Sequence, residues 1–430
     1  MRDYIMPGSQ RTLLFAGMGL GVLCLILSWF VGTDEFHTRF WTNLLHNTVF
    51  FTGISFIALF FICVCITAWA GWYTLFKRVW EAFSLFMIFG FIIMIIIGLG
   101  NYMGFHHLYH WNDPESIVSD KIINHKSSFL NKNVYMIGGI IVMAIWYFFA
   151  RKLRSLSLAE GEDGDASFHH HHTARVYAAA FLPFAGFSSA FIIWQWVMSL
   201  DAHWYSTMFA WYSGASWFVS MICMTILVLV YMKSKGYYQQ VTTEHIHDLG
   251  KFLFAFSIFW TYLWFSQYML IWYANIGEET VYFRHRLDNY PVLFYGNLLI
   301  NFIFPFFVLM RNDTKRKFGS VGIVAVIVLF GHWWDYFLMI KPGALHTAHE
   351  LAGHHGGGHA DGHGAGHGAE GVVEHASHFV SGFTLPGLIE IGVFIGFLSA
   401  FLYVVYNRLA AAPLVSERDP YIAERIHHHV

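Results

Sequence analysis

Ten long apolar segments limit the folds open to this chain more than any other feature of its sequence. Hydrocarbon offers no water to exposed backbone groups, so an apolar run of about 20 residues that crosses a membrane has to satisfy its own amides as a helix. The runs lie at residues 12–32, 48–73, 80–103, 133–150, 176–200, 209–232, 250–274, 291–310, 319–340 and 386–407. The sequence therefore predicts an all-α polytopic membrane protein with ten transmembrane helices.

The composition is typical of a chain that is mostly surrounded by lipid or by other helices. Of the 430 residues, 56% are hydrophobic and only 12% are charged, whereas a soluble domain usually carries about 25% charged residues. The net charge of −2 argues against a nucleic-acid partner. The first apolar run is long enough to span the membrane and lacks a small-residue cleavage site, so we expect it to be a retained helix.

The Lys and Arg residues are distributed unequally between alternate loops. Most of the 25 fall in the set of loops that includes both termini. The opposite set holds only Arg39, Lys121, Lys126, Lys132, Arg284, Arg286 and Lys341. The positive-inside rule therefore predicts that both termini lie in the cytoplasm.

A faint internal repeat suggests how the spans are grouped. Residues 50–56, FFTGISF, open the second span, and residues 211–217, WYSGASW, open the sixth. We expect two four-helix bundles, spans 2–5 and spans 6–9, with spans 1 and 10 flanking them. Chance similarity in an aromatic-rich chain is the alternative, since Gly and Ser also serve as close helix contacts without any repeat. The predicted divisions of the chain are residues 1–47, 48–200, 201–340, 341–385 and 386–430.

The segment predicted at residues 341–385 is a His- and Gly-rich loop on the outer side. Its histidines are His346, His349, His354, His355, His359, His363, His367, His375 and His378. Several are four residues apart, as on a metal-binding helix face, but the many glycines oppose a stable helix. We therefore expect a disordered loop that binds metal only adventitiously, and we interpret residues 169–172 and 427–429 in the same way.

Polar side chains at membrane depth gather in the outer half of the predicted bundle. A polar group inside a span is costly, so such a cluster favours a functional site. His332 and Asp335 are three residues apart and share a helix face. A histidine beside a carboxylate can accept a proton near neutral pH and pass it on. The candidate proton carriers are His332, Asp335, Asp201 and Glu390.

A second group of polar side chains could line a site for a quinol headgroup or a path for water. Its members are Gln195, Gln267, Tyr268 and Asn297, and tryptophans such as Trp194, Trp196, Trp333 and Trp334 would wall it. The alternative is structural, because Trp and Tyr belts and interhelical Asn or Gln hydrogen bonds occur in many helical bundles. Asp201 also fits a simple position at the water interface. For the His332–Asp335 pair with its neighbours, function is the favoured interpretation.

The sequence shows none of the common patterns that hold redox cofactors or nucleotides. It lacks paired histidines at mid-membrane depth on facing spans, an iron–sulfur cysteine cluster and a P-loop. The cysteines lie inside apolar runs, where we expect them to be small packing residues: Cys24, Cys63, Cys65 and Cys223. If the protein takes part in redox chemistry, its partners must carry the electron cofactors.

Two stretches of the sequence resemble a known family of membrane subunits. One is residues 199–209, SLDAHWYSTMF, between the fifth and sixth spans. The other is residues 247–256, HDLGKFLFAF, followed by residues 260–275, WTYLWFSQYMLIWYAN. These runs are similar to the F subunit of bacterial alternative complex III, a quinol:cytochrome c oxidoreductase, in a family related to the NrfD and polysulfide-reductase membrane subunits. The resemblance is dense over residues 180–340 and weaker before them.

The resemblance implies a multi-pass subunit of the bacterial inner membrane, with two four-helix bundles and two flanking helices. It implies as partners a homologous ten-span NrfD-like subunit, an iron–sulfur subunit, multihaem and monohaem cytochrome c subunits, small membrane subunits and a terminal oxidase. The resemblance implies no covalently bound cofactor. It does imply a quinol of the menaquinol type and structural lipid. In that family the better-supported quinol site belongs to the second ten-span subunit. The long His-rich loop departs from the family pattern.

Three hypotheses follow from the sequence. In the first, the chain is an integral subunit of a respiratory quinol:cytochrome c oxidoreductase and supports quinol oxidation or proton conduction in the outer half of the membrane. In the second, it is a scaffold for assembly without a site of its own. In the third, suggested by the repeat, it is a secondary transporter, although no span is clearly broken at mid-membrane as transporter sites usually require.

Overall fold

The computed structural model describes residues 4–31, 36–163, 167–356, 383, 385–415 and 419–421. In these residues it contains helices and no strands, and ten helical stretches are long and apolar enough to cross a membrane. This confirms the predicted all-α, ten-span fold. The spans are Gly8–Val31 (α1), Thr38–Thr67 (α2), Lys77–Met103 (α3 and α4), Val134–Gly161 (η2 and α7), His169–Leu200 (α8 and η3), Met208–Ser234 (α9), Thr243–Ala274 (α10), Pro291–Leu309 (α12, η4 and α13), Phe318–His349 (in α15) and Leu388–Ala410 (α16).

Several of these spans are built from shorter helical pieces, and short helices also connect them. The pieces are Lys77–Ser84 (α3), Met87–Met103 (α4), Val134–Gly138 (η2), Gly139–Asp163 (α7), His169–Trp196 (α8), Met198–Leu200 (η3), Pro291–Leu298 (α12), Leu299–Ile303 (η4) and Phe304–Leu309 (α13). The connecting helices are His110–Asn112 (η1), Pro114–Ser119 (α5), Lys121–Lys126 (α6), Gly277–Asn289 (α11) and Asn312–Arg316 (α14). The helix that contains the ninth span, α15, runs over Phe318–Gly356.

Two helices are longer than their apolar runs suggest. The second span begins at Thr38 rather than at residue 48, because the polar residues that precede the apolar run are buried and hydrogen-bonded against α15 and α16. The ninth continues past Lys341 and Pro342 into the segment that was expected to be loop. In both places the polar side chains find partners inside the protein, so they do not have to face water.

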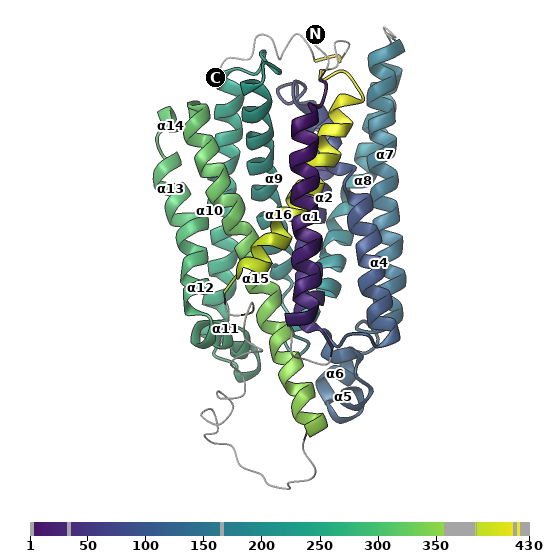
Figure 1. Cartoon of the computed structure of the whole chain (residues 1–430), viewed down its shortest axis with the longest axis vertical. Coiled ribbons are helices and arrows are strands. Elements are labelled where there is room, and N and C mark those ends of the chain that lie inside the picture. The colour runs from purple at the N-terminus through teal and green to yellow at the C-terminus, as the bar shows by residue number, and fades with distance from the viewer. Residues whose placement is uncertain are drawn as a thin grey trace.

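The start of α1 and the end of α16 lie at the same end of the bundle, and α5, α6 and α11 lie at the other (Figure 1). We call these the termini end and the loop end. An even number of spans requires this arrangement. The cytoplasmic position of the termini end stays a prediction from the charge distribution.

The spans pack as two groups that meet at α2 and α9. In the first group α2 contacts α3, α4 and α8, while α7 contacts α4 and α8. In the second group α9 contacts α10 and α15, and α12 and α13 pack against α15 and α10. In the most apolar stretches of the central helices α2 and α9, 89% and 83% of the residues are buried, compared with 22% in α1. The lipid-facing surface is therefore carried mainly by the peripheral helices.

The two repeated segments contact each other at the centre of the molecule. Gly53 of α2 lies directly against the indole of Trp217 of α9, where a larger side chain would not fit. The ring of Phe56, which occupies in the first segment the place of Trp217 in the second, lies 6.2 Å from the Trp217 ring. The repeat thus falls where the two helical groups contact each other.

The flanking helices α1 and α16 form a close pair held together by small residues. Gly21 faces the backbone of Gly396, and Gly392 faces the side chain of Cys24. Small residues let two helix backbones approach closely, which is a main source of helix association in lipid. The pair then packs on α2 and α3, mostly through α16.

A bulky residue at this contact is expected to loosen the pair. Gly396→Val would place a side chain against the backbone of Gly21, and overpacking of this kind costs about 1–3 kcal/mol. Gly19→Val is the matched control, because a side chain at Gly19 meets open space. Thermal unfolding in mild detergent should show a lower midpoint for Gly396→Val than for Gly19→Val. Equal midpoints would contradict the assigned contact.

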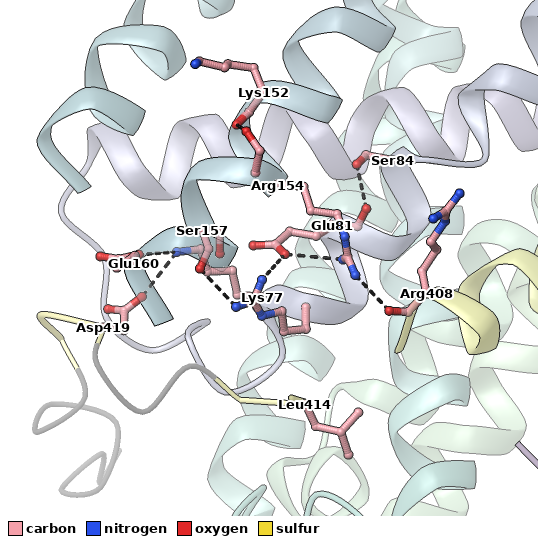
Figure 2. A network of polar contacts seen from close by, with 12 residues as sticks. Lys77, Glu81, Ser84, Lys152, Arg154, Ser157, Glu160, Arg408, Leu414 and Asp419 are labelled. Carbon is pink, nitrogen blue, oxygen red and sulfur yellow. Dashed lines mark hydrogen bonds and ion pairs between the residues drawn. The ribbon is translucent and has the colours of Figure 1, made fainter. Parts of the chain in front are cut away.

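Buried ion pairs hold the helices together at the termini end (Figure 2). The network joins α3, α7 and the segment after α16, and it also takes up the Arg408 carbonyl, which accepts from Arg154 at 2.8 Å. Its ion pairs are Lys77 with Glu160 at 3.6 Å and Asp419 at 3.3 Å, and Glu81 with Arg78 at 3.0 Å and Arg154 at 3.5 Å. The cations and anions are balanced in number, so the charges compensate one another within the network.

One histidine of the run at residues 169–172 belongs to this network. The structure starts α8 at His169, and His171 is buried with Nδ1 3.3 Å from Glu160. The expectation of disorder is therefore wrong for this run, because composition alone could not reveal that Glu160 lies opposite. Residues 357–382 and 427–429 lie outside the described residues.

Candidate functional site

Asp335 lies near the middle of α15 and is completely buried. Its carboxylate accepts hydrogen bonds from three side chains on three other helices. Trp260 Nε1 of α10 donates at 3.0 Å, Asn297 Nδ2 of α12 donates at 2.8 Å, and the Tyr212 hydroxyl of α9 donates at short distance. The four helices of the second group thus converge on one carboxylate.

All of these donors are neutral, and no Lys or Arg ion pair with Asp335 is found in the described part of the chain. A buried charge without a counter-charge is costly, and hydrogen bonds from neutral donors offset part of that cost. The Tyr212 hydroxyl can also reverse and accept, which would let the same site hold a protonated carboxyl group. Asp335 is therefore placed to bind and release a proton without disrupting the helices around it.

His332, one turn before Asp335, is also completely buried but has different neighbours. Its Nδ1 lies 2.9 Å from the Ser216 hydroxyl of α9, and its ring meets the Trp260 ring edge-on at 5.4 Å. Its Nε2 has no hydrogen-bond partner among the described residues. The pair predicted from the sequence therefore shares a face and a neighbour, Trp260, while each side chain makes its own hydrogen bonds.

A π-helical turn in the eighth span supports Asn297. Pro305 has no backbone N–H, and the preceding turn, Leu299–Ile303, adopts π-helical geometry. Within this turn, Asn301 Nδ2 donates to Asn297 Oδ1 at 2.6 Å and to the Gly331 carbonyl at 2.9 Å. The amide of Asn297 is thus fixed with its Nδ2 towards Asp335.

Glu390 lies in a separate cluster between α2, α15 and α16. Arg39 donates to both of its oxygens, at 2.9 and 3.1 Å, and Asn43 Nδ2 donates at 3.2 Å. Glu390 also accepts from the Gly387 backbone N–H at 3.0 Å, which caps the start of α16. The structure does not bring Glu390 together with Asp335; it makes Glu390 part of an interhelical clamp.

Lys341 completes this clamp from α15. Its ammonium donates to Asn43 Oδ1 at 2.6 Å and to the Thr42 hydroxyl at 2.8 Å, and it lies 4.6 Å from the centre of the Phe383 ring. The side chain is fully buried. The cluster therefore holds two cations, Arg39 and Lys341, and one carboxylate, Glu390.

Asp201 lies at the loop end and pairs with Arg286 of α11. Arg286 Nη2 donates to Asp201 Oδ2 at 2.9 Å, and Arg286 Nε donates to the Leu338 carbonyl at 3.1 Å. Leu338 is four residues before Pro342, which has no N–H to satisfy that carbonyl. Arg286 thus supplies the hydrogen bond that Pro342 removes from α15.

This assignment predicts a compensating pair of substitutions. Arg286→Met should leave the Leu338 carbonyl and Asp201 without their donor and cost about 3 kcal/mol of stability, as removal of one partner of a buried pair does. Adding Pro342→Ala to Arg286→Met should recover part of that loss, because residue 342 regains an N–H for the Leu338 carbonyl. Thermal denaturation of the four proteins of this cycle measures the coupling. Strict additivity would contradict the assignment.

The remaining candidates lie at different places along the loop-end half. Gln195 of α8 is buried and donates to the Phe129 carbonyl at 2.8 Å, away from the residues bonded to Asp335. Gln267 of α10 accepts from the Ser206 hydroxyl at 3.2 Å. Tyr268 packs in a row of rings, 6.5 Å from Trp264 and 5.4 Å from Phe283. Of the four headgroup candidates, Asn297 alone hydrogen-bonds Asp335.

The space beside this cluster is small. A cavity of about 20 Å³, lined by Tyr212, Gln267, Tyr282 and Arg286 among apolar side chains, lies between the cluster and the loop end. A cavity of that size holds one water molecule. In this conformation it cannot hold a quinol ring, so the geometry favours a path for protons or water over a headgroup site.

Sequence reasoning did not find several residues that complete these clusters. Tyr212 and Trp260 were seen only as parts of the repeat and of the family-like run, and Arg39, Arg286 and Lys341 were counted as loop charges. A signal was present for Arg286, since a carbonyl released by Pro342 needs a donor. For Lys341, its place four residues after Phe337 and eight after Trp333 on one helix face indicated burial.

No family model matches the chain, and no curated protein matches it significantly.

Proposed function

We infer that the chain is an integral subunit of a respiratory quinol:cytochrome c oxidoreductase of the alternative complex III type, in a bacterial inner membrane, and that its own contribution is proton conduction in the outer half of the membrane. Asp335 is the central proton carrier. The family-like runs at residues 199–209 and 247–275 support membership of such a complex. The partners would be the second ten-span subunit, the iron–sulfur protein, the c-type cytochromes, small membrane subunits and a terminal oxidase.

One observation carries the proton role. Asp335 is a fully buried carboxylate that accepts hydrogen bonds from three neutral donors on three helices. One of these donors, the Tyr212 hydroxyl, can either donate a hydrogen bond to Asp335 or accept one from it. Ionisable residues at membrane depth typically mark ion or proton pathways. His332 lies one turn away, and its imidazole is a second group that can bind and release a proton. A cavity large enough for one water molecule adjoins Tyr212.

The structure supports quinol oxidation by this chain itself less well than it supports proton conduction. The cavity beside Tyr212, the residue that joins it to Asp335, is too small for a quinol ring. We therefore place quinol chemistry, and the menaquinol-type substrate, with the partner subunits. The electron cofactors are carried by those partners as well.

A scaffold role has its own supporting observation. The Glu390 cluster joins three helices and includes the flanking helix α16, as expected of a structural clamp. Scaffold and proton roles can coexist, and they differ in which substitutions matter for activity. A transporter role has no comparable observation in its favour.

Purification in mild detergent tests the proposal. The native protein should co-purify with c-type haem and with quinol:cytochrome c activity, and a His332→Ala, Asp335→Asn double variant should assemble but turn over poorly. Normal turnover of an assembled double variant would remove the proton role. A solitary, haem-free protein would remove the complex and bring the transporter hypothesis forward.

A further inference from the structure

Two spaces lie in series between Asp335 and the loop end. The inner one is the cavity of about 20 Å³ lined by Tyr212, Gln267, Tyr282 and Arg286, which we call the chamber. The outer one is a cavity of about 390 Å³ between the link that follows α8, helix α11 and the end of α15, which we call the vestibule. Its polar walls are His110, His203, His285, His346, Asp201 and Glu278.

Tyr282 separates the two spaces, since it lines both of them. Its ring is fixed between two flat groups. The Tyr282 ring stacks on the indole of Trp204, with 3.9 Å between the ring centres and 13° between the ring planes. The Arg286 guanidinium also lies over the Tyr282 ring, 3.4 Å from its centre. These contacts hold the ring in place. A proton that passes between the two spaces therefore has to move along polar groups rather than through an opening made by rotation of Tyr282.

The Arg286–Asp201 pair connects the spaces across this wall. Arg286 lines the chamber, Asp201 lines the vestibule, and Arg286 Nη2 donates to Asp201 Oδ2 at 2.9 Å. Burial would lower the pKa of Arg286, but Tyr282 and Asp201 raise it above its usual value, so the guanidinium stays charged. A fixed positive charge in the chamber disfavours a lasting hydronium ion there, so a proton on the chamber water moves on to the Asp201 carboxylate.

Tyr212 connects the chamber with Asp335. It lines the chamber and donates its hydroxyl proton to the Asp335 carboxylate. A hydroxyl can donate one hydrogen bond while accepting another. When Asp335 carries the proton, it can give that proton to the Tyr212 oxygen as the tyrosine's own proton moves to a chamber water. The tyrosine is thereby regenerated, and one proton has moved outward.

We propose that Asp335 exchanges protons with the outer aqueous phase through Tyr212, one chamber water and Asp201, and that the imidazole-lined vestibule is the outer mouth of this route. The inference rests on the proposed proton function of Asp335 and adds the path by which the proton leaves. From the chamber water the proton passes beside the Arg286 guanidinium, which lines the chamber, to the carboxylate of Asp201 with which Arg286 pairs. Asp201 then releases the proton to water in the vestibule. No oxidant or reductant is needed in these steps.

The vestibule chemistry agrees with a mouth for protons. Burial, and then the charge of Arg286, lowers the pKa of His285 to about 4, so this imidazole is neutral near pH 7. A neutral imidazole adds hydrogen-bonding capacity without a positive charge that would repel an emerging proton. Asp201 itself is partly accessible, with 20% of its side chain exposed.

Blocking the vestibule tests the route without altering a buried residue. Val281 lines the vestibule and is 57% exposed, and the native cysteines are all buried. Val281→Cys would be treated with a membrane-impermeant, positively charged methanethiosulfonate in the purified, active complex. Ile276→Cys, at a residue 51% exposed that precedes α11 and is not among the vestibule walls, is the control. We expect modification to slow quinol-driven turnover by about tenfold at Val281→Cys and to leave Ile276→Cys unchanged.

Substitution of Asp201 gives an independent measurement. Asp201→Asn keeps an oxygen for Arg286 but removes the proton carrier, so turnover should fall by about tenfold, with recovery in Asp201→Glu. Asp288→Asn, at an exposed carboxylate of the same face, is the control and should turn over normally. A stable Asp201→Asn protein with full turnover, or full turnover of modified Val281→Cys, would overturn the route.

The same assay separates this inference from the function on which it rests. If Asp335→Asn is inactive while both vestibule variants turn over fully, Asp335 functions but its proton leaves elsewhere. If Asp335→Asn turns over normally, the proposed function itself fails. Slow turnover of all three variants with normal controls supports the function and the route together.

Discussion

Asp335→Asn is expected to lower proton-coupled turnover by about a hundredfold or more, which is the scale on which positioned acid–base groups act. The amide is nearly the same size as the carboxyl group but cannot take up or release a proton near neutral pH. Turnover is measured in the purified complex, with assembly checked by size-exclusion chromatography. We expect assembly to persist, because an amide oxygen in place of Oδ1 still accepts from Tyr212 and Asn297, and only the hydrogen bond from Trp260 is lost.

The control for this substitution lies one residue along the same helix. Tyr336 is completely buried, and its hydroxyl donates to the Ser213 carbonyl at 2.9 Å rather than to Asp335. Tyr336→Phe therefore removes one buried hydrogen bond at a cost of about 1 kcal/mol while leaving the Asp335 contacts in place. Equal losses of turnover in Asp335→Asn and Tyr336→Phe would indicate that packing, rather than proton exchange, limits activity.

Glu390→Gln is expected to have the largest effect on stability. It would leave Arg39 and Lys341 buried together without their carboxylate, and breaking a buried ion pair by removal of one partner costs about 3–5 kcal/mol. We expect the variant to accumulate poorly and to unfold at a clearly lower temperature. Fluorescence-detected size-exclusion chromatography and thermal denaturation in mild detergent measure both effects.

Lys341→Met is the informative counterpart of that substitution. It removes the cation that is in excess, leaves the paired Arg39 and Glu390, and keeps an unbranched apolar stem against Phe337 and Phe383. We expect a stability change of about 1–2 kcal/mol, mainly from the hydrogen bond lost to Asn43. A Lys341→Met protein as unstable as Glu390→Gln would contradict the charge balance assigned to this cluster.

The membrane architecture could be predicted from the sequence because it rests on local properties. Apolar length alone predicts a span, and all ten predicted spans are present as helices. The limits of those spans were less certain where polar residues are buried. The segment that begins at Thr38 and the continuation of α15 past Lys341 contain charges that composition assigns to loops. Their partners, Glu390 and Asn43, lie far away in the chain.

The candidate site was predicted in outline only. The shared helix face of His332 and Asp335 follows from their spacing, and Asn297 was chosen for its polar amide at the right depth. Spacing cannot show that Tyr212 and Trp260 point at Asp335, since this depends on how α9 and α10 rotate against α15. Nor can it show that Glu390 lies in a clamp with Arg39, 351 positions away.

Infrared difference spectroscopy of the carboxyl groups tests the central claim, that Asp335 binds and releases a proton, most directly. Spectra of the purified complex are recorded as the pH is stepped and during quinol-driven turnover, for wild type and Asp335→Asn. The account predicts a protonated-carboxyl C=O band that rises and falls in wild type, shifts in deuterated water and is missing in Asp335→Asn. Identical carboxyl difference spectra in the two proteins would contradict it.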